Sequence, residues 1–378
     1  MDWQKVHDAF PVNREMIWLN NCGTTPAGVH AVEAVTRHLT GYAQKGILTE
    51  TAGYVNVRRN IKAVLAKLLN CRADELALIH NTAEGMNFVS RGLNLAPGDE
   101  LILLENEYPS NIYPWKHWGK KGIRLLFAPM SDTPEEFFRG LFSLVNQKTR
   151  AMALSAVHWC TGMPLPLSAI GNLCRERGIA LIIDGAQGVG MQPMDVKRMG
   201  ISYMSFSAWK WLLGPLGVGV FYIAEDKLSE LDPIFLGSES VIDDHAYLPY
   251  KDELKPTADR FTYSTGNWND WVYFAASLDF LAAVGFETVR RRIFKLSDRL
   301  SKGLTAIGFK VLSFRHPGWP TGIVVCEKSG LAAPLILSHL KKHRIIAAER
   351  LGRIRFSPHI YNSPEQMDKV VTVLGALA

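Results

Sequence analysis

The 378-residue chain contains few cysteines, and they are not arranged for a disulfide framework or a zinc ribbon. There are five, an odd number, and no two of them form a Cys-x-x-Cys pair. They are Cys22, Cys71, Cys160, Cys174 and Cys326. We therefore expect neither a disulfide-bonded secreted fold nor a structural metal site, and we expect a reducing cytoplasmic location.

Signal-like and membrane-like segments are also missing. The first sixteen residues carry no apolar signal core, and no later stretch reaches the roughly 18 uninterrupted apolar residues of a membrane span. Lys and Arg number 42 against 36 Asp and Glu, a formal charge of +6, but the basic residues do not gather in blocks. We expect a protein that enters no membrane and binds no nucleic acid, and that prefers small anionic ligands.

The composition is that of a globular chain with a large core, since 47% of residues are hydrophobic and 21% are charged. A chain of this length usually forms more than one hydrophobic core, so one large and one smaller domain are expected. No internal repeat or low-complexity linker is present. The substrate site should therefore lie between the two domains.

Short apolar runs alternate with helical patterns through the first two thirds of the chain. Helices are expected over 28–45, 54–70 and 167–177. Strands are expected over 75–80, 100–105, 123–130, 151–159, 180–184, 201–209 and 218–224. Because these strands are almost continuously apolar, we predict an α/β fold with a buried, mostly parallel sheet covered by helices on both faces.

The pattern changes near residue 270, where a C-terminal α+β domain is expected. Its predicted elements are helices over 270–284 and 287–304, strands over 309–314 and 322–327, a helix over 331–342, strands near 344–348 and 353–357, and a last helix after Pro364. We divide the chain into an N-terminal segment, 1–20, that packs on the small domain, a large domain, 21–265, and a small domain, 266–378.

Asp184 is the first candidate functional residue, because it closes a buried strand and is followed at once by small residues. In open α/β sheets the ligand crevice lies beyond the carboxyl ends of the strands. A simple turn-capping role is the alternative. The sequence at 185–190, GAQGVG, does not match the Gly-x-Gly-x-x-Gly fingerprint, and no acidic residue follows at the expected spacing, so a nicotinamide cofactor is set aside.

Lys210 is the second candidate, because it stands between Trp209 and Trp211 just after a strand. Desolvation lowers the pKa of an amine, which favours condensation with an aldehyde; a lysine snorkelling from a strand end is the alternative. Asp184 lies 26 residues earlier, which places both residues on neighbouring strand ends of one sheet. The pair matches pyridoxal 5'-phosphate (PLP), whose ring needs a carboxylate beside its nitrogen and a lysine on its aldehyde.

The segments Asp184-Gly-Ala-Gln187 and SAWKWLLGPLG at 207–217 resemble the Asp-x-Ala-Gln and Ser-x-x-Lys-x-x-x-Gly-Pro-x-Gly motifs of the class V aminotransferase and cysteine desulfurase family. The resemblance extends over almost the whole chain. It implies a fold type I PLP-dependent transferase with a seven-stranded type of sheet in its large domain, and a homodimer with shared active sites. It also implies Asp184 on the pyridine nitrogen, Gln187 near the ring hydroxyl and Lys210 as the Schiff-base lysine.

The segment HNTAEGMNFV at 80–89 resembles the family's phosphate loop, in which backbone N–H groups at a helix start bind an anion. Thr82 and Ala83 are the candidates, and an N-cap at the same helix end is compatible with that role. Ser207 would add a hydroxyl. Trp209 departs from the phosphate-binding histidine of many relatives, so the resemblance implies a larger contribution from the neighbouring subunit.

Two residues, Gly266 and Asn267 in YSTGNWN, best match the family segment that crosses to the partner's cofactor, although such a sequence is also common loop chemistry.

Tyr108 occupies the place where cysteine desulfurases carry a histidine stacked on the cofactor ring. A tyrosine still stacks, and we count it among the catalytic and cofactor-binding candidates, but its unperturbed pKa of about 10 prevents the same acid or base role. His158 is expected to face the substrate, with a satisfied structural histidine as an equal alternative. An aromatic-rich entrance, with Tyr108, Trp115, Trp159 and Trp268, suggests a bulky substrate side chain. Core filling is the alternative for Tyr108 and the preferred explanation for Trp115.

Arg355 in GRIRFSPHIYN matches the family arginine that binds the substrate α-carboxylate, for which a planar guanidinium is suited. Asn20, Asn21 and Gly23 resemble the N-terminal segment that lies over the substrate; of these Asn21 is the substrate-binding candidate.

A cysteine desulfurase needs a mobile cysteine upstream of this arginine, and HRIIAAERLGRIR at 343–355 contains none. Cys326 lies in an apolar strand, and Cys22 and Cys160 are not where the family places its nucleophile. The predicted activity is therefore that of a lyase (C–S or C–C cleavage) or aminotransferase, acting on an amino acid or a derivative through an external aldimine. An epimerase or a desulfurase-like enzyme is the alternative, and a non-catalytic binding or regulatory protein is the alternative of another class.

Overall fold

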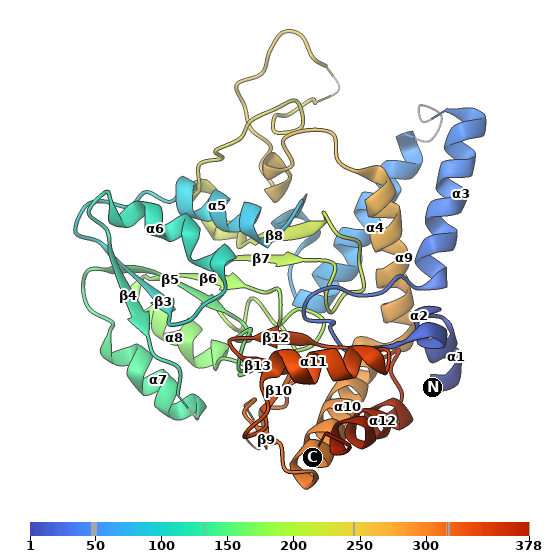
Figure 1. Cartoon of the computed structure of the whole chain (residues 1–378). Coiled ribbons are helices and arrows are strands. Elements are labelled where there is room, and N and C mark those ends of the chain that lie inside the picture. The colour runs from blue at the N-terminus through green and yellow to red at the C-terminus, as the bar shows by residue number, and fades with distance from the viewer. Residues whose placement is uncertain (47–50, 132, 245, 315, 317, 378) are drawn as a thin grey trace.

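The central sheet has seven strands, in the order β2-β8-β7-β6-β5-β3-β4 (Figure 1). The computed structural model describes residues 1–46, 51–131, 133–244, 246–314, 316 and 318–377. The strands are β2 (Leu76–Ile79), β3 (Glu100–Leu104), β4 (Arg124–Ala128), β5 (Thr149–Ser155), β6 (Ala180–Asp184), β7 (Tyr203–Ser207) and β8 (Gly219–Ile223). Only β8 is antiparallel to its neighbours, β7 and β2, while the pairs from β7 to β4 are parallel. The predicted α/β fold with a mostly parallel sheet is confirmed.

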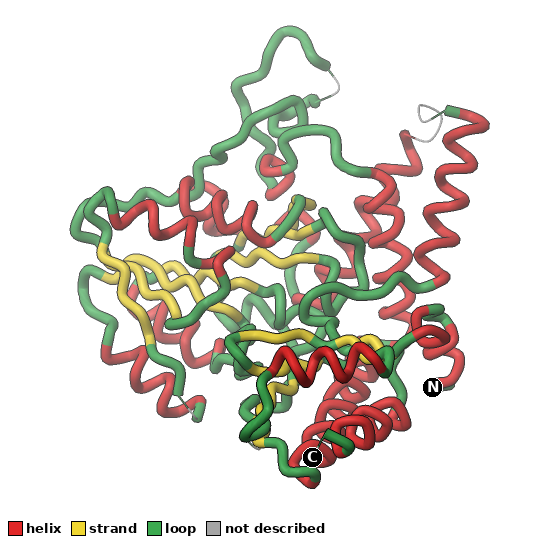
Figure 2. The backbone as a smooth tube through the Cα atoms, in the orientation of Figure 1, coloured by secondary structure: helices red, strands yellow, loops and turns green. Residues whose placement is uncertain are grey.

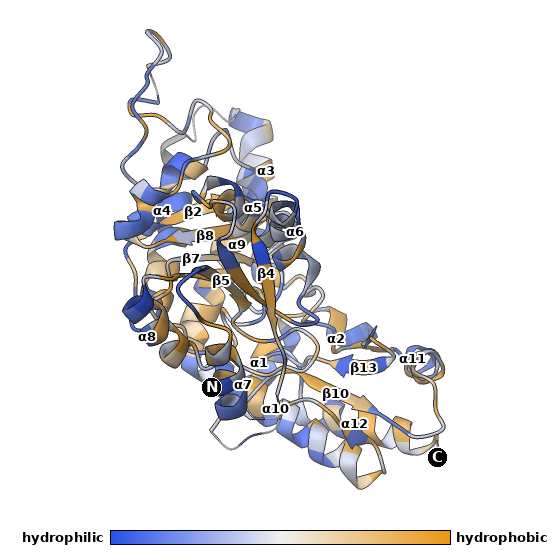
Figure 3. Ribbon diagram, turned by 90° about the vertical axis from the view of Figure 1, so that its left-hand side faces the viewer, coloured by the Kyte–Doolittle hydropathy of each residue, from blue (hydrophilic) through white to orange (hydrophobic). Residues whose placement is uncertain are grey.

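Helices cover both faces of this sheet, whose strands are mostly apolar (Figure 3). They are α4 (Thr51–Leu69), α5 (Thr82–Gly92), α6 (Tyr113–Gly119), α7 (Pro134–Ser143), α8 (Leu167–Arg177) and α9 (Trp268–Val284). Along β5, Ala151 and Ala153 join the core under α5 and α6, whereas Met152 and Leu154 join the core under α7 and α8. This alternation follows from the period of two along a strand.

The N-terminal turn of α5 reaches the site because the helix lies unusually close to the sheet. Gly85 on α5 faces Ser205 of β7, and a Cβ built on that glycine would overlap the serine side chain. A glycine is therefore needed for this close approach. The consequence is that Thr82, at the first position of α5, comes within hydrogen-bonding distance of Ser207 at the end of β7.

A separate core forms around the C-terminal sheet, whose order is β12-β13-β10-β9. Its elements are α10 (Phe286–Ala306), β9 (Lys310–Val311), β10 (Val324–Glu327), α11 (Ala333–Lys342), β12 (Ala348–Arg350), β13 (Arg353–Phe356) and α12 (Pro364–Gly375). All the strand pairs in this sheet are antiparallel. The expected C-terminal α+β arrangement is thus present, with strands shorter than predicted at 309–314 and 322–327.

The N-terminal elements are α1 (Trp3–Asp8), α2 (Val12–Glu15), β1 (Ile17–Trp18) and α3 (Val29–Lys45). The first strand, β1, pairs in parallel with β11 (Ile345–Ile346), and Ile17 and Leu19 belong to the C-terminal core. The helix α9 packs against α3 and α4 (Figure 1). The domain boundaries at 20/21 and 265/266 remain predictions. The helix α9 follows the second boundary in the sequence but packs with the N-terminal helices α3 and α4.

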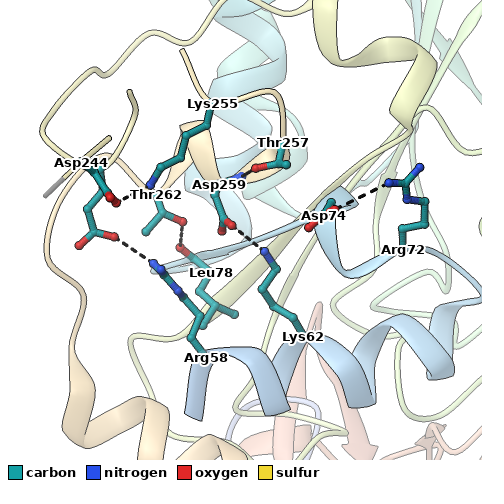
Figure 4. A network of polar contacts seen from close by, with 11 residues as sticks. Arg58, Lys62, Arg72, Asp74, Leu78, Asp244, Lys255, Thr257, Asp259 and Thr262 are labelled. Carbon is teal, nitrogen blue, oxygen red and sulfur yellow. Dashed lines mark hydrogen bonds and ion pairs between the residues drawn. The ribbon is translucent and has the colours of Figure 1, made fainter. Parts of the chain in front are cut away.

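The described part of residues 231–266 forms a long excursion with little regular structure (Figure 2). It contains one short helix, η5 (Ala258–Phe261). The other short helices of this type are η2 (Ala73–Glu75), η3 (Pro109–Asn111) and η4 (Glu225–Glu230). Two ion pairs attach it to α4, Arg58 to Glu239 at 3.0 Å and Lys62 to Asp259 at 2.9 Å (Figure 4). The Lys62 pair is largely buried, so removal of either partner would leave a charge without its partner in a poorly solvated position.

Within the described ranges, no single helix is both long and apolar enough to cross a membrane. The helices α9 and α10 reach that length and composition only as a pair, which bends by 82°.

Buried histidines should make the fold sensitive to acid. Burial lowers the pKa of His158 to about 4 and that of His359 to about 3, and the His359 ring stacks with Trp211 and Tyr361. In the unfolded chain these rings take up a proton near pH 6.5. As the pH falls below 6.5, the unfolded state therefore binds more protons than the folded state, and the free energy of unfolding decreases.

We expect a loss of about 2 kcal/mol per buried histidine between pH 6.5 and pH 5. Urea unfolding of wild type and His359→Gln at pH 7.5 and pH 5.0 measures it. The variant should lose less stability than wild type over this interval, whereas His343→Gln, at an exposed position, should lose as much as wild type. An equal acid loss in wild type and His359→Gln would contradict this explanation.

Candidate active site

A cavity of about 340 Å³ lies where the carboxyl ends of β6 and β7 meet the start of α5 and the β12–β13 hairpin. Most of the predicted site residues line it. They are Thr82, Ala83, Tyr108, Asp184, Gln187, Ser207, Lys210 and Arg355. These residues come from segments as far apart as positions 82 and 355, and the volume is in the range of small-molecule sites.

Asp184 is the last residue of β6, and its side chain is buried. The Ala186 N–H donates to its Oδ1 at 2.9 Å. Burial raises the pKa of this carboxyl, while the nearby Lys210 and the hydrogen bond oppose that shift. A carboxylate held at a strand end in this way suits a protonated ring nitrogen, which would replace the solvation lost on burial.

Lys210 lies in the turn that follows β7, with its Nζ 5.5 Å from the centroid of the Tyr108 ring. Burial lowers the pKa of the amine, and the Asp184 carboxylate opposes the shift. Desolvation, which was predicted from the sequence, is the largest cause of the lowered pKa of Lys210. A lysine with a lowered pKa has a larger neutral fraction, which is the form that attacks an aldehyde or accepts a proton.

Gln187 bridges two segments of the cavity wall. Its Nε2 donates to the Cys22 carbonyl at 3.1 Å, and its Oε1 accepts from the Trp211 Nε1 at 2.9 Å. Both ends of the amide are thus bonded to the protein. The residue ties the N-terminal segment at Cys22 to the turn that carries Lys210.

The start of α5 provides the anion-binding groups expected from the sequence. Asn81 caps the helix by accepting from the Glu84 N–H at 3.0 Å. The hydroxyls of Thr82 and Ser207 lie 2.7 Å apart, and Ala83 lines the same end of the cavity. The first N–H groups of a helix have no partner within it and, with the two hydroxyls, fit a phosphate.

Arg355 on β13 is buried and directs its guanidinium into the cavity. Its Nη1 donates to the Trp159 carbonyl at 2.9 Å, but its buried Nε has no hydrogen-bond partner in the described residues. A buried donor without a partner is costly. A ligand carboxylate would satisfy it, so the residues present fit both an amino-acid substrate and PLP. No group of three or more His, Cys, Asp or Glu side chains in the described part of the chain is placed to hold a metal ion.

Three predicted site residues do not line this cavity. Asn21 is fully buried behind the wall and accepts from the Tyr361 hydroxyl at 3.2 Å. His158 is also buried, and its two ring nitrogens contact the Asn106 carbonyl and the Thr161 hydroxyl. Contact of His158 with substrate is not supported by this position, which matches the structural alternative; the next residue, Trp159, lines the cavity instead.

Asn267 is the third. It caps α9 by accepting from the Asp270 N–H and, with Gly266, lines a different pocket beside β2. Of the aromatic residues considered for the entrance, Trp115 is core, as preferred, and Trp268 packs on Trp271. Only Tyr108 and Trp159, with ring centroids 5.5 Å apart, remain beside the cavity, so the case for a bulky side chain rests on them.

Two charged residues at or beside the cavity were not predicted from the sequence. Glu107 is buried next to the site and accepts from the Ser155 N–H and hydroxyl at 3.0 and 2.7 Å. Burial, with the Asp184 carboxylate, raises its pKa to about 7. Its position after β3 satisfies the strand-end rule that identified Asp184, so the rule could have found it. Arg350 lines the cavity with Arg355, and its position depends on the register of a hairpin.

The cysteines other than Cys22 are poorly placed for nucleophilic chemistry, because none of them lines the cavity. Burial raises the pKa of Cys160 and of Cys326 to about 12. Upstream of Arg355, the connection from β12 to β13 is the two-residue turn Leu351–Gly352, with φ of 52° and 75°. Such a turn has no room for a mobile cysteine loop. Cys22, buried at the cavity wall, is the one thiol that lines the cavity in the described structure.

The fold and the convergence of a lysine, a strand-end aspartate and a carboxylate-binding arginine define a PLP-dependent enzyme of fold type I. The chain belongs to the class V aminotransferase family, whose model matches residues 17–370. A Pyrococcus abyssi protein named "Probable cysteine desulfurase" is 26% identical over 398 residues, covering 99% of this chain and 97% of that protein.

Two solved structures illustrate the likeness. The apo structure of a cysteine desulfurase from Thermococcus onnurineus superposes with a TM-score of 0.89 at 22% identity, covering 99% of this chain and 97% of that one. A cystine C–S lyase in complex with its product cysteine persulfide has a TM-score of 0.88 at 25% identity, covering 97% and 99%. The first likeness concerns the fold alone.

Proposed function

We propose that this PLP-dependent enzyme is a carbon–sulfur lyase acting on cysteine derivatives. The observation that carries the proposal is the convergence of Lys210, Asp184 and Arg355 on one cavity, at a point where the chain has no loop for a sulfur-accepting cysteine. The relative named a cystine C–S lyase supports this reaction class, and the probable cysteine desulfurase supports sulfur-containing amino acids as substrates.

The roles follow from the positions of the side chains. Arg355 would bind the substrate α-carboxylate through its unpartnered Nε, which orients Cα toward Lys210. Lys210 would hold the cofactor aldehyde and, once displaced by substrate, accept the Cα proton, as its lowered pKa allows. Asp184 would keep a proton on the ring nitrogen. When bound, PLP supplies the electron sink for the negative charge left on Cα.

The phosphate and the ring would be held by the remaining wall. Thr82, Ala83 and Ser207 would bind the phosphate at the start of α5. Tyr108 would stack on the ring, since its aromatic face lies beside the Lys210 amine. Gln187 would stand near the ring hydroxyl, although in this structure its amide is bonded to Cys22 and Trp211.

Elimination and desulfuration differ in where the sulfur goes. In elimination the Cβ–S bond breaks and the sulfur leaves as sulfide, a thiol or a persulfide. One water molecule is consumed, the carbon skeleton is released as pyruvate and the amino group as ammonia. In desulfuration a protein thiol takes up the sulfur and the amino acid becomes alanine. The raised pKa values of Cys160 and Cys326 and the tight turn at Leu351–Gly352 favour elimination.

Product analysis of the holoenzyme with L-cystine and L-cysteine tests the proposal. We expect stoichiometric pyruvate and ammonia, formed on the order of 10³-fold or more faster than by Lys210→Ala. Pyruvate is measured with coupled lactate dehydrogenase, and alanine by amino-acid chromatography. Alanine as the product, with a persulfide found on Cys22 by mass spectrometry, would instead establish desulfuration. A new amino acid formed only when a keto acid is added would establish transamination.

We also propose a homodimer in a reducing cytoplasm. Gly266 and Asn267 lie at a pocket other than the one with Lys210, as the cross-subunit role requires. Large apolar side chains are exposed on α3 and on the excursion, among them Val32, Leu236 and Tyr250, and a subunit interface would cover such side chains. All five cysteines are free, which agrees with a reducing compartment.

A further inference from the structure

We propose that Glu107 is a positioning residue that acts through Asp184, because its carboxylate adds a second buried negative charge next to the one that faces the ring nitrogen of PLP. The inference rests on the proposed function, which gives Asp184 the task of keeping a proton on that nitrogen. It deepens that function by giving a role to a buried carboxyl that the proposed reaction does not otherwise use.

Hydrogen bonds hold Glu107 against the strand next to Asp184. The Ser155 N–H donates to the Glu107 Oε2 at 3.0 Å, and the Ser155 hydroxyl donates to its Oε1 at 2.7 Å. Ser155 is the last residue of β5, and it is directly opposite Asp184, the last residue of β6. The two buried carboxyls are therefore neighbours at the same edge of the sheet, and the Asp184 charge raises the pKa of Glu107.

The contacts of Glu107 suit a charged carboxylate. Besides the two bonds from Ser155, its Oε1 accepts from the Tyr108 N–H at 2.7 Å. Two of these three donors are backbone N–H groups, which cannot accept a proton in return. A neutral Glu107 would have the Ser155 hydroxyl alone as an acceptor for its proton. Three donated hydrogen bonds therefore stabilise the ionised form against the cost of burial.

The charge of Glu107 has no cationic partner in the described part of the chain. Burial and the Asp184 charge raise its pKa to about 7, and the three hydrogen bonds oppose that shift. A buried carboxylate without a counter-ion is costly. A protonated ring nitrogen beside Asp184 would supply the missing positive charge for both carboxylates. The unpaired charge of Glu107 thus fits a cationic group of a ligand in the cavity.

The neighbours of Glu107 leave it as the group that changes charge near neutral pH. The titratable groups around it are Asp184 on β6, Lys210 after β7, Tyr108 before η3, and His158 and Cys160 after β5. Burial holds the pKa of His158 at about 4 and that of Cys160 at about 12, so both stay neutral between pH 6 and pH 8.5. Asp184 stays ionised when it faces a protonated ring nitrogen.

Cofactor affinity should therefore depend on pH through Glu107. A positive ring nitrogen beside Asp184 lowers the pKa of Glu107 below the value of about 7 that it has in the empty site. Glu107 then loses its proton when the cofactor binds. By linkage, its contribution to affinity is fully present above pH 7 and is lost as the pH falls. Glutamine has nearly the same shape without the charge, so Glu107→Gln corresponds to the wild type at low pH.

Two ligands that differ in one ring atom test the inference. They are PLP and its deaza analogue, in which a C–H group replaces the ring nitrogen. Calorimetry with the full chain gives both dissociation constants at pH 6.0, 7.0 and 8.5. All proteins carry Lys210→Ala, which removes the covalent linkage and the titration of the lysine. To this background we add, one at a time, Glu107→Gln, Ser155→Ala, Asp184→Asn and, as the matched control, Glu105→Gln, which changes an exposed glutamate of the same turn.

We expect Glu107→Gln to weaken PLP binding roughly tenfold at pH 8.5, the effect of unit charges about 10 Å apart at an effective dielectric constant of about 20. At pH 6.0 the loss should be less than about threefold, and the deaza analogue should show no larger loss at any pH. Ser155→Ala keeps the charge but removes one donor, which raises the pKa of Glu107. It should weaken PLP about threefold at pH 7.0 and leave the affinity at pH 8.5 nearly unchanged. Glu105→Gln should change nothing.

A loss in Glu107→Gln that is the same at every pH, or the same for both ligands, would show a purely structural role and overturn the inference, as would no loss at all. If thermal unfolding shows that Glu107→Gln does not fold, Ser155→Ala decides, and an unchanged PLP affinity at pH 7.0 overturns the inference.

Failure of the proposed role of Asp184 has a different signature, which is an Asp184→Asn protein that binds both ligands as the background does. The inference would then fail with it, because Glu107 acts through Asp184. A weakened Asp184→Asn with an unchanged Glu107→Gln overturns the inference alone. The lyase reaction itself is tested separately, by pyruvate formation, and does not enter these binding measurements.

Discussion

Lys210→Ala should abolish the visible absorbance band of the internal cofactor linkage and lower kcat on the order of 10³-fold or more. The band of a lysine-bound cofactor is expected near roughly 400–430 nm. Proton transfer by a positioned side chain contributes about 10²–10⁴-fold, and the same residue also holds the cofactor. Spectra of wild type and variant after incubation with PLP, together with pyruvate formation, measure both effects.

Lys62→Ala is a matched control, since Lys62 is also a buried lysine but forms an ion pair with Asp259 on the excursion. It should lower the temperature of unfolding, because it leaves the Asp259 carboxylate without its partner, and leave the visible band in place. A wild-type protein with no visible band after incubation with PLP would contradict the assignment of Lys210. A band that survives Lys210→Ala unchanged would do so as well.

Asp184→Asn should lower kcat by roughly 10²-fold or more while PLP remains bound, because an amide cannot keep a proton on the ring nitrogen. Asparagine has nearly the shape of aspartate, so its side-chain oxygen can still accept from the Ala186 N–H. The measurement is kcat for pyruvate formation, with PLP content read from absorbance. The loss of kcat therefore measures the effect of the Asp184 charge separately from any effect on packing.

Glu107→Gln provides the comparison, since Glu107 is a second buried carboxyl beside the site but does not line the cavity. Its bonds go to Ser155 and to the Tyr108 N–H. We expect a loss of kcat well below that of Asp184→Asn. Similar losses in the two variants would indicate that negative charge near the ring, rather than Asp184 itself, is what matters.

The arrangement of the central sheet could be predicted because its signals are local. Apolar runs predicted the strands, and the parallel direction followed from the helices between them. Asp184 and Lys210 could be placed together by the same reasoning, since the carboxyl ends of neighbouring parallel strands meet at one edge. Arg355, Thr82 and Ser207 came from the family resemblance, and the cavity contains all of them.

The placement of other site residues could not be predicted, because adjacent residues of the chain lie on different sides of the cavity wall. His158 and Trp159 are adjacent, yet the backbone after β5 directs the first into the interior and the second to the cavity. Asn21 is likewise buried, whereas its neighbour Cys22 reaches the wall. These residues lie in or next to turns, where adjacent side chains leave the backbone in directions that the local sequence pattern does not specify.

The sequence by itself determined the α/β class, the strand-end pair of Asp184 and Lys210, and the absence of a cysteine between residues 343 and 355, because each depends on local pattern or composition. The tertiary structure alone decided that Arg350 joins Arg355 in the cavity while Arg353 pairs with Glu327. The physical reason is that the register of β12 on β13, and the contact of that hairpin with the central sheet, arise from packing between distant segments.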